Sequence, residues 1–274
     1  MTDMDHLLSL PTAHYDVSDI VKFPPLSLSA SSLTPLEKLY MGTFLVAAQP
    51  KIVVEFGVLK AVTTAYICAC LEENGIDATV YGFDLPHQIE ETRAANATVR
   101  ALEASGRLVL VPGSLPESFT EWAASHNQQI DFALVDARHT FPHVTTEIEA
   151  LWARLSRFGV ILCHDYDENA IHDGVRYALD HFAQRTPDAQ MCHLSTQMTN
   201  FDDLMTTADA ADPLAVFTHV STLAVLRKRP YDLREEMLAE HMNVPLDQLR
   251  RAQATSQGSI LQRIIRKVKR IIAP

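Results

Sequence analysis

Five short apolar runs, separated by segments of helix length, most constrain the fold of this chain. Each run is rich in β-branched or aromatic residues and nearly continuous in apolar ones. Such strands with intervening helices are typical of a parallel sheet covered on both faces. Right-handed crossovers then predict an α/β, doubly wound sheet. The runs are KIVVEFG at 51–57, ATVYGFD at 78–84, RLVLVPG at 107–113, IDFALVDA at 130–137 and GVILCHDY at 159–166.

Further elements are expected on both sides of these runs. Thr34-Pro35-Leu36-Glu37 combines a capping residue, a first-turn proline and a capping-box acid, which predicts a helix of about a dozen residues. A helix is also expected near 171–185. Two later strands, at 191–197 and 218–229, could form an antiparallel hairpin at one edge of the sheet.

The composition is that of a globular protein with an acidic surface. A chain of 274 residues with 47% hydrophobic residues suits one α/β domain with extensions. The net charge of −11 argues against a general nucleic-acid binder, because such a protein needs a basic face. The first residues are acidic where a signal peptide would be basic, and no apolar run approaches the ~18 residues of a membrane span. A cytoplasmic protein is therefore expected.

Carboxylates stand at the ends of most of the expected strands. In open parallel sheets, ligands bind outside the carboxyl ends of the strands. Here these ends carry Glu55, Asp84, Asp136 and the pair His164-Asp165. An acid that ends an apolar strand needs a partner, so the row suggests a polar ligand. Asp84 falls where a carboxylate binds the ribose in nucleoside sites, although it could instead cap the next helix.

Two stretches resemble class I methyltransferases that use S-adenosylmethionine (SAM). VVEFGVLKAVTTA resembles their first motif, an acid followed by Gly, three residues and Gly. DFALVDARHTFPHVTTEIEALWARLSRFGVILCHDYD is similar to the second half of the macrocin O-methyltransferase and cephalosporin hydroxylase-like group. The resemblance covers 51–185 and is most specific at 130–167. It implies a Rossmann-like, mostly parallel, seven-stranded sheet with an antiparallel edge strand.

The same resemblance implies a set of cofactor-binding residues. Glu55 and Gly57 would lie under the methionine part of SAM. Asp84 would bind the ribose and Ser114 would lie near the adenine. Ala61 replaces the second loop glycine of the family, and a Cβ at a positive-φ position can cost roughly 1 kcal/mol. The full set is Glu55, Gly57, Thr63, Asp84, Ser114 and Asp136.

Residues near the last two parallel strands would act on the methyl acceptor. Asp136, His164 and Asp165 match positions where metal-dependent O-methyltransferases hold Mg²⁺ or another divalent cation. The alternative is a hydrogen-bonded set without metal. His139 matches the histidine of the family and would be the general base for an acceptor hydroxyl, with Asp136 as the second catalytic residue. A loop histidine without a catalytic role is the alternative for His139.

These observations predict a SAM-dependent O-methyltransferase that methylates a hydroxyl of a small molecule, a sugar or a natural-product intermediate. A non-catalytic scaffold with the same fold and a metal-dependent hydroxylase are the alternatives; Ala61 and Val62 favour the scaffold. The expected organisation is a leader over 1–33, a methyltransferase domain over 34–230 and a helical extension over 231–274.

The C-terminal segment 259–272 predicts a basic amphipathic helix. Its apolar residues fall on one helical face and its basic residues on the other. Such a helix could lie on a membrane surface or bind a partner. It could equally pack on the acidic domain or on the second subunit of a homodimer.

Overall fold

The computed structural model describes residues 22, 24, 33–166, 173–194 and 221–228. All of them fall within one compact unit that spans Met1–Lys228. Most of the expected leader, the segment 198–217 and the whole extension 231–274 lie outside the described residues, so the predictions made for them stay predictions. In the described part of the chain, no helix is long and apolar enough to cross a membrane.

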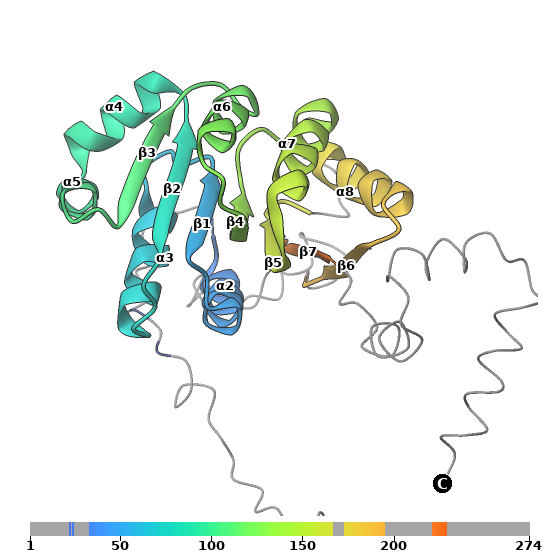
Figure 1. The fold of residues 1–274 in the computed structure, drawn as a ribbon, viewed down its shortest axis with the longest axis horizontal. Helices are drawn as coiled ribbons and strands as arrows, with labels where there is room; N and C mark the ends of the chain where they lie inside the picture. The colour runs from blue at the N-terminus through green and yellow to red at the C-terminus, as the bar shows by residue number, and fades with distance from the viewer. Residues whose placement is uncertain (1–21, 23, 25–32, 167–172, 195–220, 229–274) are drawn as a thin grey trace, which may run out of the picture. The chain divides into compact units, whose positions relative to one another are not determined.

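A seven-stranded sheet forms the centre of this unit, in the order β3-β2-β1-β4-β5-β7-β6 (Figure 1). Strands β1 to β5 are parallel to one another, whereas β7 is antiparallel to both β5 and β6. The Rossmann-like fold class is confirmed, with the antiparallel strand one position inside the edge. The strands are β1 (Ile52–Phe56), β2 (Thr79–Asp84), β3 (Leu108–Pro112), β4 (Ile130–Val135), β5 (Leu155–Cys163), β6 (Ala189–His193) and β7 (Ala224–Lys228).

Strand β5 begins at Leu155, earlier than the predicted start at residue 159. The preceding helix ends at Arg154 and passes directly into the strand. Leu155 is buried and pairs with Ile130, but Phe158 is 74% exposed. The first half of β5 therefore has one buried residue among exposed and half-buried ones. Because this part of the sequence is not a continuous apolar run, it does not predict the start of the strand.

Helices cover both faces of the sheet and enclose two hydrophobic cores. One core includes side chains of α2, α3, α4 and α5, and the other includes side chains of α6, α7 and α8. The strands contribute to both cores, which explains their continuous apolar runs. The helices are α2 (Pro35–Ala48), α3 (Val62–Glu73), α4 (Pro86–Ala95), α5 (Ala97–Ala104), α6 (Glu117–Ser125), α7 (Phe141–Arg154) and α8 (Asp173–Arg185).

The predicted start of α2 is confirmed in detail. The backbone N–H of Glu37 donates to Thr34 Oγ1 at 3.2 Å, and the backbone N–H of Thr34 donates to Glu37 Oε2 at 2.8 Å. Two otherwise unsatisfied backbone donors are thereby paired, as a capping box requires. Because α2 packs beside α3 and β5, this cap also fixes where the carboxylate of Glu37 lies.

Candidate functional site

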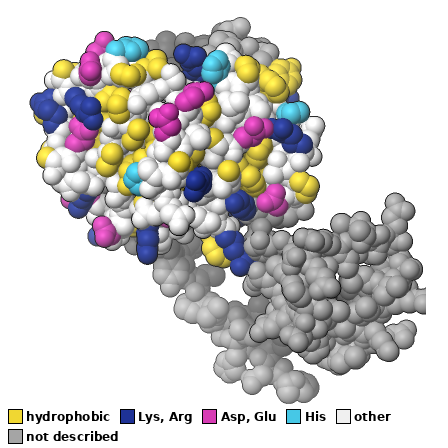
Figure 2. Space-filling view, turned by 45° about the horizontal axis from the view of Figure 1, so that its top comes forward, with side chains coloured by type: hydrophobic (Ala, Val, Ile, Leu, Met, Phe, Trp, Pro, Cys, Tyr) yellow, Lys and Arg dark blue, Asp and Glu magenta, His cyan; other side chains and the backbone are white. Residues whose placement is uncertain are grey.

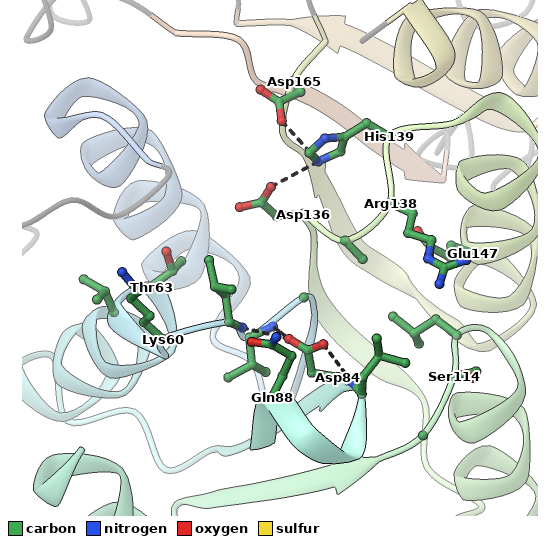
Figure 3. Close-up of a pocket in the computed structure, with 18 residues that line it drawn as sticks. Lys60, Thr63, Asp84, Gln88, Ser114, Asp136, Arg138, His139, Glu147 and Asp165 are labelled. Carbon is green, nitrogen blue, oxygen red and sulfur yellow. Dashed lines mark hydrogen bonds and ion pairs between the residues drawn. The ribbon is translucent and has the colours of Figure 1, made fainter. Parts of the chain in front are cut away.

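A pocket of about 460 Å³ opens at the carboxyl ends of the parallel strands (Figure 3). Its walls come from the loops after β1, β2, β3, β4 and β5, together with the first turn of α3 and one residue each of α4 and α7. This is the position expected for a ligand in an open α/β sheet. Neither Glu55 nor His164 lines the pocket. The predicted site residues that do line it are Gly57, Thr63, Asp84, Ser114, Asp136, His139 and Asp165.

Gly57 lies where β1 and β4 approach each other closely. Its φ is +89°, and a Cβ built on it would lie 2.1 Å from the carbonyl oxygen of Asp136. The backbone N–H of Asp136 donates to the carbonyl of Phe56 at 2.9 Å, which holds the two loops together. Glycine is therefore required here by the protein's own backbone as well as by any ligand that approaches the loop.

Asp84 ties the loop after β1 to the end of β2. Its Oδ2 accepts hydrogen bonds from the backbone N–H groups of Val58 at 2.9 Å and Leu59 at 2.8 Å (Figure 3). Its Oδ1 accepts from the N–H of Leu85 at 2.7 Å, just before α4. A carboxylate offers about four acceptor positions, so these three bonds leave room for roughly one ligand hydroxyl.

Ala61, at the position expected for the second glycine of the first motif, has a left-handed backbone conformation. It has φ +56° and ψ +27°, it precedes the first residue of α3, and its side chain is fully buried. Leu59 in the same loop also has a positive φ, of +46°. The loop thus keeps a left-handed conformation without glycine at either position, which places roughly 1 kcal/mol of strain on each residue.

Glu55 is buried beneath this loop and does not reach the pocket. Only 1% of the residue is exposed, and the hydroxyl of Thr64 donates to its Oε2 at 2.5 Å. Burial raises the pKa of Glu55 to about 8, against the effect of the Thr64 hydrogen bond, and the charges of Asp136 and Asp84 add to the rise. The acid of the first motif therefore joins β1 to α3 in this structure.

Asp136, His139 and Asp165 meet at the end of the pocket next to β5. The Nε2 atom of His139 lies 3.5 Å from Asp136 Oδ1 and 3.1 Å from Asp165 Oδ2 (Figure 3). One ligand atom from each residue lies within 4.8 Å of the others, so the three could hold a divalent cation. An imidazole in the set favours a transition metal over Mg²⁺.

His164, predicted as a metal ligand, lies behind this group. Its Nδ1 is 3.3 Å from Asp136 Oδ1 and 3.2 Å from Asp165 Oδ2. Its Nε2 is 3.4 Å from Glu37 Oε2 on α2. Burial lowers the pKa of His164, but its hydrogen bonds to the three carboxylates outweigh burial and hold that pKa well above its usual range. A protonated His164 therefore balances part of the negative charge of the cluster.

The start of β7 holds Asp165 in place. Asp165 has a φ of +59°, and its N–H donates to Thr222 Oγ1 at 3.2 Å. Thr222 in turn donates to Glu37 Oε1 through its backbone N–H at 2.6 Å and through its hydroxyl at 3.1 Å. Burial works against ionisation of Asp165, but the hydrogen bond and charge of His164 keep its pKa below the usual range. The cluster is thus fixed from α2, β5 and β7 together.

One comparison with known proteins matches the segment of the chain that holds the pocket. Residues 54–166 match the model of a methyltransferase domain, and this range contains the whole pocket. A comparison with curated protein sequences finds no match.

Solved structures of O-methyltransferases share the fold of this unit. One is an O-methyltransferase from Bacillus cereus in complex with SAH, at 13% identity and a TM-score of 0.52, over 73% of this chain and 83% of that chain. TomG from Streptomyces achromogenes, in complex with SAM, has 14% identity and a TM-score of 0.50 over 70% and 78%. CalS11, a TDP-rhamnose 3′-O-methyltransferase, has 18% identity and a TM-score of 0.50 over 69% and 77%. At these identities the likeness shows the fold alone.

Two buried acids near the site, Glu37 and Glu147, are not among the site residues predicted from the sequence. The capping box fully explained Glu37, and nothing nearby in the sequence signalled its contact with His164. Glu147 did carry a signal, because it interrupts the apolar stripe of Val144, Ile148 and Leu151 on α7. Burial raises the pKa of Glu147 to about 8, although the charges of His139 and Arg138 lower it.

Charged groups of both signs are interspersed on the face drawn in Figure 2. On the face shown in Figure 2, basic, acidic and hydrophobic side chains alternate over the described residues without a continuous patch of either sign. A nucleic acid needs an extended basic surface, and the described part of this face does not present one.

Proposed function

We propose that the chain is a SAM-dependent O-methyltransferase that methylates a hydroxyl of a small polyol, a sugar or a natural-product intermediate. The observation that carries this proposal is the position of His139. Its imidazole lies between two carboxylates at one end of a pocket whose other walls suit a nucleoside. This position supports a role for His139 as the proton acceptor beside a bound methyl donor.

The residues of the pocket fit SAM along its length. Asp84 retains room for a ribose hydroxyl beside its three backbone bonds. Gly57 lets a ligand approach the loop backbone without meeting a side chain, and Ser114 lines the pocket beyond Asp84. When bound, SAM supplies an activated methyl group. The chain has to bind the acceptor in line with that group and to remove a proton from it.

His139 is the residue assigned to proton removal. Its hydrogen bond to Asp136 raises its pKa above the ordinary value of 6.5, against the effect of burial, and the nearby charge of Asp165 adds to the rise. A larger share of His139 is therefore protonated at neutral pH than for an exposed histidine. Because only the neutral imidazole accepts a proton, turnover should increase as the pH rises through this raised pKa.

Asp136, His139 and Asp165 could instead hold a divalent cation. A bound metal would lower the pKa of an acceptor hydroxyl and orient it. His139 would then be a ligand rather than the base, so metal dependence separates the two arrangements. For the acceptor class, support comes from CalS11, whose name describes methylation of a sugar nucleotide.

The test is methyl transfer from isotope-labelled SAM to a panel of sugars, sugar nucleotides and small polyols, with and without divalent cations. His139→Ala should lower turnover by about 10²–10⁴-fold while SAM binding persists. His87→Ala is the matched control, because His87 is exposed on α4 and does not line the pocket. Unchanged turnover in His139→Ala would remove the base assignment. A wild-type protein that neither binds SAM nor methylates any acceptor would favour a scaffold role.

A further inference from the structure

Glu147 is a buried acid without a hydrogen-bond donor at one of its oxygens. It lies on the second turn of α7, and only 1% of the residue is exposed. Its Oε2 has no hydrogen-bond partner among the described residues. Removing a carboxyl oxygen from water without a replacement partner is unfavourable, typically by about 1–3 kcal/mol.

An apolar side chain would suit the same position better if packing alone mattered. Residues 144, 148 and 151 of the same helix face are Val, Ile and Leu, all buried in the core that α7 shares with the sheet. A leucine at 147 would continue this stripe and remove the unpartnered oxygen. The presence of an acid there points to a ligand that supplies the missing donor.

The walls around Glu147 indicate what kind of ligand group this is. Glu147 lines the same pocket as Leu115 and Ala137, two half-buried apolar side chains that pack on the core. Arg138 and Ser114 complete this side of the pocket (Figure 3). The apolar side chains of Leu115 and Ala137 could cover the faces of a flat ring, and the buried carboxyl of Glu147 could accept a hydrogen bond from an N–H donor at the edge of that ring.

We propose that Glu147 is the residue that selects the nucleobase of the methyl donor, by accepting a hydrogen bond from the exocyclic amino group of adenine. The inference rests on the proposed function, since it takes SAM as the occupant of the pocket. Adenine presents an amino group at C6, whereas hypoxanthine presents an oxygen there, and two facing acceptors repel. A polar site that loses its hydrogen-bond partner discriminates strongly between such analogues.

The test is calorimetric titration with S-adenosylhomocysteine and with S-inosylhomocysteine, which differ at C6 of the base. Wild-type protein should prefer the adenine compound by at least about tenfold. Glu147→Leu should weaken its binding by about 10–100-fold and abolish the preference. Glu147→Gln keeps an acceptor oxygen and should stay within about threefold of wild type. Glu117→Gln is the control, because Glu117 is an exposed acid on α6 outside this pocket.

Each contrary outcome has a distinct meaning. Wild-type protein that binds neither compound overturns the proposed function together with this inference. Wild-type protein that binds both equally, or Glu147→Leu that keeps the preference, overturns the inference and leaves the methyltransferase assignment intact. A raised KM for the acceptor in Glu147→Leu, with cofactor binding unchanged, overturns the inference. Glu147 would then bind the acceptor and not the nucleobase. If Glu147→Leu does not fold, two other results test the inference. These are the preference of the wild-type protein for the adenine compound and the affinity of Glu147→Gln for that compound.

Discussion

Replacing Glu55 by glutamine should leave the free energy of unfolding nearly unchanged in mild acid and raise it in base. Glu55 is buried on β1, and its pKa of about 8 makes it a neutral acid over much of the physiological range. Glutamine has the same shape and no charge. Its amide oxygen can accept the hydrogen bond that the hydroxyl of Thr64 donates to Glu55 Oε2. The substitution therefore exchanges one neutral side chain for another below pH 8.

The magnitude follows from the difference in proton affinity between the folded and unfolded chain. Glu55 ionises near its ordinary pKa of 4.5 when unfolded and at about 8 when folded. Between these values the unfolded chain has released the proton and the folded chain retains it, so folding becomes less favourable as the pH rises. At about 1.4 kcal/mol per pKa unit, the wild-type protein loses on the order of 5 kcal/mol from this group between pH 4.5 and pH 8. Glu55→Gln does not.

The assay is urea unfolding of both proteins at pH 5 and pH 9. The free energy of unfolding of Glu55→Gln, relative to wild type, should rise by several kcal/mol from pH 5 to pH 9. Glu147 also has a raised pKa, but it is present in both proteins. Its contribution to the pH dependence therefore cancels when the two free energies of unfolding are subtracted. Glu73→Gln, an exposed position on α3, serves as the control and should show no such change. An equal difference at both pH values would show that Glu55 is ionised in the folded protein and is not the neutral acid expected from its raised pKa.

Three further substitutions test the loops and the cluster. Gly57→Ala should destabilise the fold by more than about 3 kcal/mol or prevent soluble expression, because its Cβ would meet the carbonyl oxygen of Asp136. Ala61→Gly should change stability by less than about 1 kcal/mol in thermal unfolding, since relief of the positive φ offsets the lost methyl packing. Glu37→Gln should cost about 3–5 kcal/mol at pH 7. The pKa of Glu37 is lowered despite burial, so this loss should shrink as the pH falls below 4.5, and a constant loss in acid would contradict the ion pair with His164.

The sheet and the location of the site were predictable because both follow from patterns within single elements. Continuous apolar runs predicted β1 to β4 nearly residue for residue, and acids at strand ends predicted the pocket. The start of β5 was predicted too late, because Phe158 and its neighbours alternate irregularly in burial. The second role of Glu37 could not be predicted, since its contact with His164 joins elements far apart in the chain. Periodicity reports burial along one helix or strand, but not which side chains meet across the fold.

Calorimetric titration of SAM into wild-type protein and into Asp84→Ala tests whether the pocket binds SAM. We expect micromolar binding to the wild type. Binding to Asp84→Ala should be at least about tenfold weaker, because that variant loses the ribose acceptor and the carboxylate that fixes the loop after β1. Equal affinities would contradict the assigned binding mode, and no binding to the wild type would contradict the methyltransferase activity itself.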